Sequence, residues 1–86
     1  MPTVARIGAI QIRIYCDDHG VPHFHAVSAD FDFKFVILDC SVISGTGRIR
    51  GRDLAIIRNW ATRHRNMLQL NWQLARDSEP LQDIED

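Results

Sequence analysis

Three of the four histidines in this 86-residue chain lie within seven positions, from His19 to His25. The neutral imidazole of histidine is the commonest metal ligand in proteins, and the side chain also titrates near neutral pH. On a β-strand, the side chains at positions i and i+2 leave the same face about 6.5–7 Å apart. A strand that contains His23 and His25 would therefore present two imidazoles side by side, and this pair is the strongest candidate for chemistry.

The paired histidines would supply two of the three or four ligands that a transition-metal site needs. In the metal hypothesis, His19 joins His23 and His25 as the third ligand. Alternative residues for completing the set are Asp17, Asp18 and His64. The expected ion is zinc or another transition metal, although no standard metalloenzyme pattern such as H-E-x-x-H is present.

Metal-free acid–base catalysis is a second chemistry that these residues support. One histidine would accept a proton and another would donate one. The candidate catalytic residues are His23, His25 and His64. Arginines would stabilise an anion such as a phosphate, and the candidates are Arg48, Arg50, Arg52 and Arg65. In the alternative interpretation, the strand histidines are structural and His64 is a hydrogen-bonded core residue, so an enzyme and a binding domain both remain open.

Charge is distributed unevenly along a chain whose formal net charge is −1. Six arginines and a single carboxylate, Asp53, lie between residues 48 and 65, whereas residues 77–86 hold five carboxylates and no base. The planar guanidinium of arginine suits phosphate and carboxylate groups. The arginine segment is therefore predicted to contact nucleic acid, a phosphorylated ligand or an acidic partner, unless it is a solvated helix face balanced by the acidic end.

Length and composition favour one globular domain. Hydrophobic residues make up 45% of the chain and charged residues 24%, which are ordinary proportions, and no apolar run is long enough for a membrane span. We expect a cytoplasmic protein without a membrane partner, because Arg6 and Arg13 interrupt any apolar signal segment. Cys16 and Cys40 lack metal-site spacing and are interpreted as small buried residues. The predicted domain covers residues 1–79, and residues 80–86 are predicted to form a flexible acidic tail.

Strands must position the histidine pair, and hydrophobic alternation predicts where they lie. Residues 10–16 form the first strand, a turn covers 17–22, and residues 23–29 pair with the first strand as a hairpin. Residues 31–38 are predicted to be the central strand, and residues 42–44 a short fourth strand. The side chains predicted to face the core are Ile10, Ile12, Ile14 and Cys16 on the first strand, and Phe31, Phe33, Phe35 and Ile37 on the third.

Helical periodicity begins near residues 51–53 and places apolar side chains on one stripe. The stripe contains Leu54, Ile57, Ala61 and His64. The pattern continues to Ala75 without proline or glycine, so it predicts one long helix or two helices jointed near residues 64–66. The predicted fold is α+β, with a small antiparallel sheet of three or four strands packed on one face by these C-terminal helices.

Three motifs carry a resemblance to a known family. They are Pro22-His23-Phe24-His25-Ala26, Trp60-Ala61 followed by His64-Arg65, and Asn71-Trp72-x-Leu74-Ala75. Together they resemble a family of small bacterial proteins known as the domain of unknown function number four-one-six-zero, over about residues 1–81. The chain departs from the family pattern at Val21, where a proline is common, and at residues 47–51, so the resemblance does not extend to an anion-binding loop there. It implies an α+β domain, a bacterial origin and gene neighbourhoods similar to toxin–antitoxin pairs, without an established activity.

The resemblance and the residues together lead to three functional hypotheses. The first is a cytoplasmic component of a toxin–antitoxin-like module that binds or acts on nucleic acid through its histidine and arginine surface. The second is a metal-binding domain that uses the His-x-His strand. The third is a non-catalytic protein-interaction module. A small cognate partner protein, nucleic acid or a further copy of the chain are the expected partners.

Overall fold

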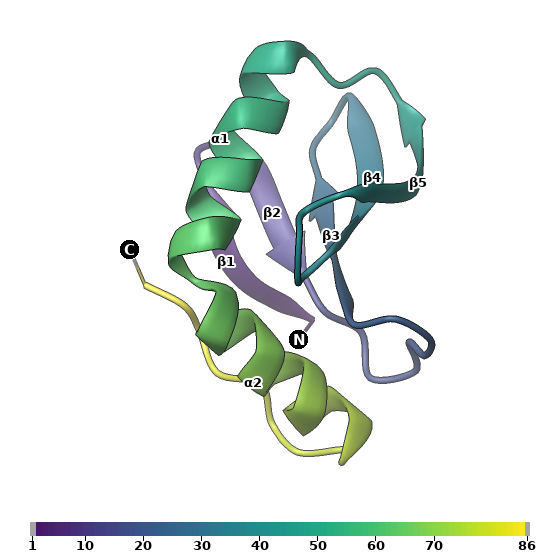
Figure 1. Ribbon diagram of the computed structural model, residues 1–86, viewed down its shortest axis with the longest axis vertical. Helices are drawn as coiled ribbons and strands as arrows, with labels where there is room; N and C mark the ends of the chain where they lie inside the picture. Colours follow the sequence, from purple (N-terminus) through teal and green to yellow (C-terminus); the bar gives the residue numbers. More distant parts are fainter. Residues whose placement is uncertain (1, 86) are drawn as a thin grey trace.

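The alternating apolar pattern builds a five-stranded antiparallel sheet, and two helices follow it (Figure 1). In this computed structural model, which describes residues 2–85, the strands lie side by side in their chain order. They are β1 (Thr3–Ile7), β2 (Ile10–Arg13), β3 (His23–Val27), β4 (Phe31–Val36) and β5 (Val42–Gly47). The predicted α+β fold is confirmed, with one strand more than the three or four expected.

β1 is a strand that the sequence pattern did not predict. Its presence changes which strand lies at the centre of the sheet. It pairs with β2 through a turn at Gly8, whose positive φ of 58° is a conformation that glycine adopts readily. Because β1 forms one edge, β3 is the central strand, and the prediction that residues 31–38 are central is wrong. The apolar run at the end of that segment has another cause, since Ile37 and Cys40 turn into the core beyond the end of β4.

The two cysteines have different environments. Cys40 is buried, as predicted, whereas Cys16 is exposed. The alternation that places Ile12 and Ile14 inward does not continue as far as Cys16, because β2 ends at Arg13 and the chain turns into the loop before β3. The prediction that Cys16 belongs to the buried face of the first strand is therefore wrong.

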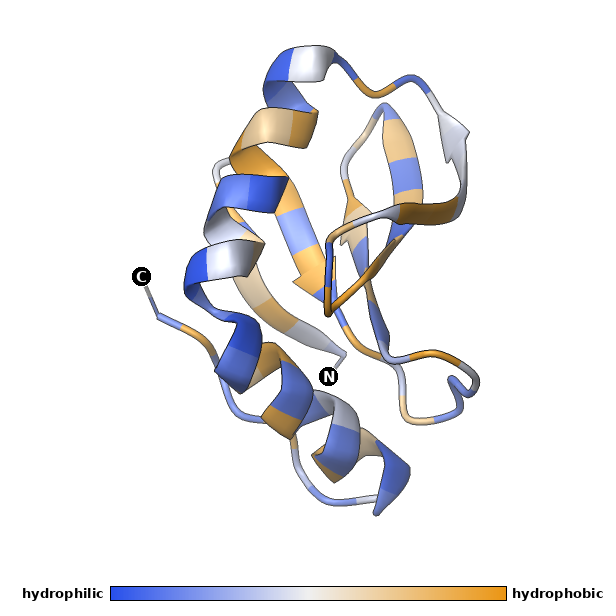
Figure 2. Cartoon of the chain, viewed as in Figure 1, coloured by the Kyte–Doolittle hydropathy of each residue, from blue (hydrophilic) through white to orange (hydrophobic). Residues whose placement is uncertain are grey.

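One face of the sheet is apolar and packs against the helices. The strand register places Ile12, Ala26 and Phe33 in one row across β2, β3 and β4, and Phe24 lies opposite Phe35 in the next. The rings of Phe24 and Phe35 stack with centroids 5.4 Å apart, and both side chains are fully buried. Each such side chain contributes roughly 1.5–3 kcal/mol through burial alone. Figure 2 shows hydrophobic and hydrophilic bands alternating along the strands.

Two helices, rather than one long helix, cover this face. α1 (Gly51–Arg63) buries Ile57, Trp60 and Ala61, and α2 (Arg65–Arg76) follows directly. The joint is His64, whose backbone N–H donates to the carbonyls of Trp60 and Ala61 while its φ of −116° leaves the helical range. The predicted joint near residues 64–66 is confirmed. Within residues 2–85, neither helix combines the length and hydropathy that crossing a bilayer requires.

Residues 80–85 return along β1 and α2 (Figure 1). Ile84 is buried, and its backbone N–H donates to the carbonyl of Val4 on β1 at 2.7 Å. The side chain of Asn71 on α2 bonds to both backbone groups of Gln82. The division into a domain at 1–79 and a flexible tail at 80–86 stays a prediction, and its outer residues, Met1 and Asp86, lie outside the described residues.

Gly45 on β5 sits beneath the ring of Phe33, and this contact predicts a stability effect. A Cβ atom at position 45 would overlap three ring atoms of Phe33. Gly45→Ala is expected to lower the free energy of unfolding by about 1–3 kcal/mol, because the ring must shift within a packed row. Urea denaturation measures the loss.

Gly51→Ala is the matched control, because a Cβ at position 51 meets no atom within 4 Å at the start of α1. It is expected to leave stability unchanged or raise it by about 0.4–1 kcal/mol. Equal effects of the two substitutions would contradict the contact with Phe33.

Candidate metal centre

β3 presents both of its histidines on one face of the sheet, where the ring of His23 also lies near Trp72 of α2. His23 and His25 alternate with Phe24, which packs into the core on the other face. The two imidazole centroids are 5.3 Å apart. The prediction that this pair leaves the sheet on one face is confirmed, and it follows from the period of two that any strand imposes.

The loop between β2 and β3 brings a carboxylate to the histidine pair. Oδ2 of Asp18 lies 3.0 Å from Nε2 of His25 and 3.3 Å from Nε2 of His23. The loop can reach back because Gly20 adopts a positive φ of 92°. The ligand atoms of Asp18, His23 and His25 all lie within 4.8 Å of one another. We call these three residues the Asp/His triad.

The outer nitrogens of the two imidazoles also face acceptors. Nδ1 of His23 donates to the backbone carbonyl of Val21 at 2.8 Å, which requires the proton on Nδ1 and leaves a lone pair on Nε2 of the neutral ring. Nδ1 of His25 lies 3.8 Å from Oδ1 of Asp32. Metal-ligating histidines ordinarily present one nitrogen to the metal and the other to a carbonyl or carboxylate. Both rings of the triad have this orientation.

Nε2 of His23 is the atom that most needs a partner. It is buried and makes no hydrogen bond, although Oδ2 of Asp18 is only 3.3 Å away. A lone pair beside a carboxylate oxygen is repulsive, and a buried acceptor without a donor costs free energy. A cation placed between Asp18 and the two imidazoles would remove both penalties.

Aromatic side chains enclose the triad. The ring of Tyr15 meets His25 edge-on at 4.7 Å between centroids, and Trp72 of α2 lies 5.0 Å from His23. His23 is 5% exposed and His25 8% exposed. Electrostatic interactions are stronger in such a water-poor environment than on the surface. The triad is therefore a shielded site with one partly accessible carboxylate.

The other two predicted histidines lie outside this cluster. His19 is exposed, and its Nδ1 lies 3.3 Å from the backbone carbonyl of Asp17. His64 is half-buried at the helix joint, where its ring lies 4.8 Å from that of Trp60. Among residues 2–85, the ligand atoms that meet the histidine pair belong to Asp18.

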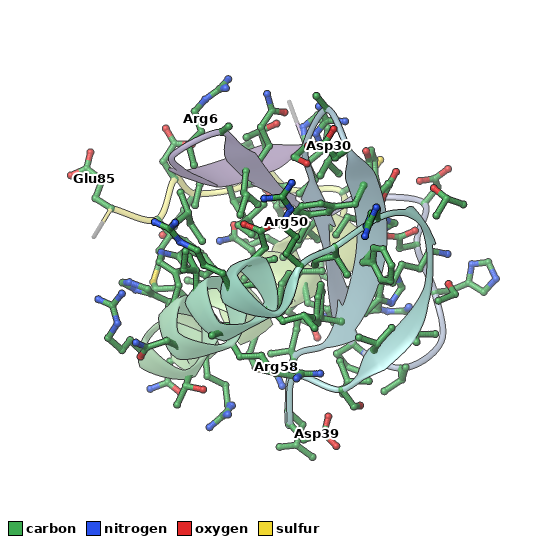
Figure 3. All side chains as sticks on the ribbon, turned by 90° about the horizontal axis from the view of Figure 1, so that it is seen from above. Arg6, Asp30, Asp39, Arg50, Arg58 and Glu85 are labelled. Carbon is green, nitrogen blue, oxygen red and sulfur yellow. The ribbon has the colours of Figure 1, made fainter. Side chains whose placement is uncertain are left out.

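The predicted anion-binding arginines are spread along the approach to α1 and at the helix joint. Arg48, Arg50 and Arg52 are exposed. A shallow cavity of about 500 Å³ is lined by Arg50 and Arg52, but also by the acidic residues Asp30 and Asp53. Figure 3 shows Arg50 and Asp30 on the same side of the molecule. These carboxylates weaken the attraction of that cavity for an anion.

Arg65 has a structural contact. Its Nε donates to the carbonyl of Ile37 at 3.3 Å. It also lies near Asp39, whose pKa is lowered first by hydrogen bonds from the backbone N–H and hydroxyl of Ser41 and further by the positive charge of Arg65. This arginine therefore ties α2 to the β4–β5 turn, and none of the four arginines contributes to the Asp/His triad.

Comparisons with known proteins give one match. A family model described as Domain of unknown function (DUF4160) matches residues 9–73, which include the triad, both helical segments up to Gln73 and all strands after β1. No curated protein and no solved structure matches this chain.

Proposed function

This chain belongs to the family described as Domain of unknown function (DUF4160), and we propose that it binds a divalent transition metal, zinc first, through Asp18, His23 and His25. One observation carries the proposal. The ligand atoms of the three residues lie within 4.8 Å of one another, and one of them, Nε2 of His23, is buried without a hydrogen-bond partner. His25 and Asp18 supply the second nitrogen and the oxygen. The metal hypothesis thus keeps His23 and His25 and takes Asp18, one of the alternatives, as its third ligand.

The ligand types favour zinc over magnesium or calcium. Two imidazole nitrogens and one carboxylate oxygen form a set that zinc commonly takes, whereas magnesium and calcium prefer oxygen ligands throughout. Nδ1–H of His23 is held by Val21 and Nδ1 of His25 faces Asp32, so the rings are oriented before an ion arrives. Pre-orientation of this kind lowers the cost of binding.

A site with three protein ligands also keeps a position for an exogenous ligand. Within residues 2–85, the cluster contains no fourth histidine, cysteine or carboxylate. Three-ligand zinc sites usually hold water, whose pKa the ion lowers towards neutrality. This arrangement is typical of catalytic rather than purely structural sites, so a hydrolytic role is the activity class that the proposal favours.

The toxin–antitoxin-like role, nucleic-acid contact and a bacterial cytoplasmic setting stay proposals with less support. Exposure of Arg48, Arg50 and Arg52 supports nucleic-acid binding. The acidic neighbours Asp30 and Asp53 count against it. A cognate partner protein rests on the family resemblance, and self-association and the non-catalytic interaction module stay proposals.

Zinc is expected to raise the melting temperature of the wild-type protein, because only the folded state brings the triad together. At a free zinc concentration about 100 times the dissociation constant, linkage adds roughly 2.7 kcal/mol, or about 10–20 °C for a domain of this size. Asp18→Asn is expected to remove most of this shift. Differential scanning fluorimetry with and without zinc measures it, and elemental analysis gives the stoichiometry.

Asp17→Asn provides the control, because it removes the same charge from the adjacent residue, which lies outside the triad. Its zinc-dependent shift is expected to match that of the wild type. A wild-type melting curve that zinc leaves unchanged, together with no bound metal, would refute the proposed function.

A further inference from the structure

A second site candidate lies beside the triad without sharing a ligand with it. A cavity of about 490 Å³ forms where the N-terminal segment, the loop after β2 and the segment after α2 meet. Its apolar wall consists of Pro2, Ile14, Pro80 and Leu81. The volume is within the range of small-molecule sites, which are concave and mostly apolar with a few polar groups. None of Asp18, His23 and His25 lines it.

The charged groups that line this cavity are both acidic. They are the carboxylates of Asp17, from the loop, and Glu79, from the segment after α2. Within residues 2–85, neither side chain has an ion pair or hydrogen bond. No lysine, arginine or histidine lines the cavity. Two unpaired carboxylates at an apolar wall attract a positive charge and repel a negative one.

Tyr15 is also one of the residues that line the cavity. Its ring meets the ring of His25 edge-on at 4.7 Å, and a tyrosine ring attracts an ammonium group placed over its face. A positive charge next to Tyr15 is Arg13, whose guanidinium donates to the Tyr15 hydroxyl at 3.2 Å and also to Gln11. Arg13 therefore reduces the preference for a cation without entering the cavity wall.

We propose that this cavity binds a small organic cation, meaning an ammonium group carried on an apolar body. Asp17 and Glu79 receive the ammonium group, and Pro80 and Leu81 receive the apolar body. The proposal goes beyond metal binding and needs no metal. It also places a ligand beside Tyr15, whose ring contacts that of His25 in the triad.

Benzylamine, benzyl alcohol and benzoate test the proposal, because they share an aromatic body and differ in charge. Titrations of ¹⁵N-labelled, metal-free protein are followed by amide shifts. Benzylamine is expected to shift the amides of residues 15–17, Ser78, Glu79 and Leu81 and to bind about five to ten times more tightly than benzyl alcohol, as two exposed ion pairs allow. Benzoate is expected to bind more weakly than either. The advantage of the amine should shrink in 1 M salt.

Two double variants distinguish binding in the cavity from a general effect of the protein's net charge. Asp17→Asn combined with Glu79→Gln is expected to reduce benzylamine affinity to that of benzyl alcohol while leaving the alcohol unchanged. Asp30→Asn combined with Asp53→Asn removes the same charge elsewhere and is expected to preserve the preference for the amine.

Equal binding of the amine and the alcohol by the wild type would overturn the proposal, as would shifts outside the cavity or equal losses in both double variants. Metal removal keeps this test independent of zinc, so either proposal can fail while the other stands.

Discussion

His23→Ala is expected to lower zinc affinity by more than about 100-fold. Loss of an outer partner of a metal ligand commonly costs 10–100-fold, and His23 is itself a proposed ligand. Its Nε2 is buried, without a hydrogen bond, and aimed at the carboxylate of Asp18. Alanine leaves one imidazole and one carboxylate, too few ligands for a stable zinc site. Competition with a chromophoric chelator at neutral pH measures both dissociation constants.

His19→Ala is the matched control, since it removes the same side chain from the loop that precedes β3. His19 is exposed and lies outside the triad, so its loss is expected to change zinc affinity by less than about twofold. The comparison tests whether His19 is a ligand of the metal. A large loss in His19→Ala, or none in His23→Ala, would be incompatible with the triad, and circular dichroism checks that both variants remain folded.

Local alternation explains why most of the sheet was predictable. Ile10, Ile12 and Ile14 repeat with the period of a strand, and so do Phe31, Phe33 and Phe35, of which Phe33 is only half-buried. β1 lacks this alternation, because its consecutive residues Val4 and Ala5 are both buried beside a register shift, and its place in the sheet depends on pairing across the turn at Gly8. Such short edge strands are stabilised by their neighbours rather than by their own sequence.

The helix joint illustrates the limit of periodicity. No proline or glycine marks it, and the apolar stripe continues through it, so the sequence left one helix and two helices open. In the structure, the helix is interrupted at His64, whose backbone dihedral angles are not helical. Buried residues lie on both sides of the joint, and tertiary packing of this kind overrides local propensity without being visible in the local pattern.

The part of the candidate site that lies on a strand was predictable from the sequence, and the part that lies on the loop was not. The shared face of His23 and His25 follows from the strand period. The third ligand does not, because its position depends on how the loop folds, including the positive φ of Gly20. From the sequence, Asp18 is one of several residues that could complete the ligand set, and the metal hypothesis takes His19 as the third ligand. The hydrogen bond from Nδ1 of His23 to the Val21 carbonyl, which orients the imidazole, likewise depends on how the loop folds.

Asn71→Ala is expected to cause one of the largest losses of stability in the chain. The Asn71 side chain is fully buried on α2, and its Nδ2 donates to the carbonyls of Met67 at 3.1 Å and Gln82 at 3.0 Å. Its Oδ1 accepts from the backbone N–H of Gln82 at 2.7 Å. Losing three hydrogen bonds and leaving a cavity predicts a decrease of about 2–4 kcal/mol in the free energy of unfolding. Urea denaturation measures it.

Asn66→Ala makes the same change on the exposed face of α2 and is expected to cost less than about 0.5 kcal/mol. Hydrogen exchange at Ile84, whose N–H is bonded to Val4, reports whether residues 80–85 remain attached. If Asn71→Ala lowers global stability, this segment is part of the domain, because its contacts contribute to the same cooperative unit. Rapid exchange at Ile84 with unchanged global stability would contradict the predicted loss. That outcome would instead place the boundary of the folded domain near residue 79, with the acidic segment as the flexible tail that the sequence predicts.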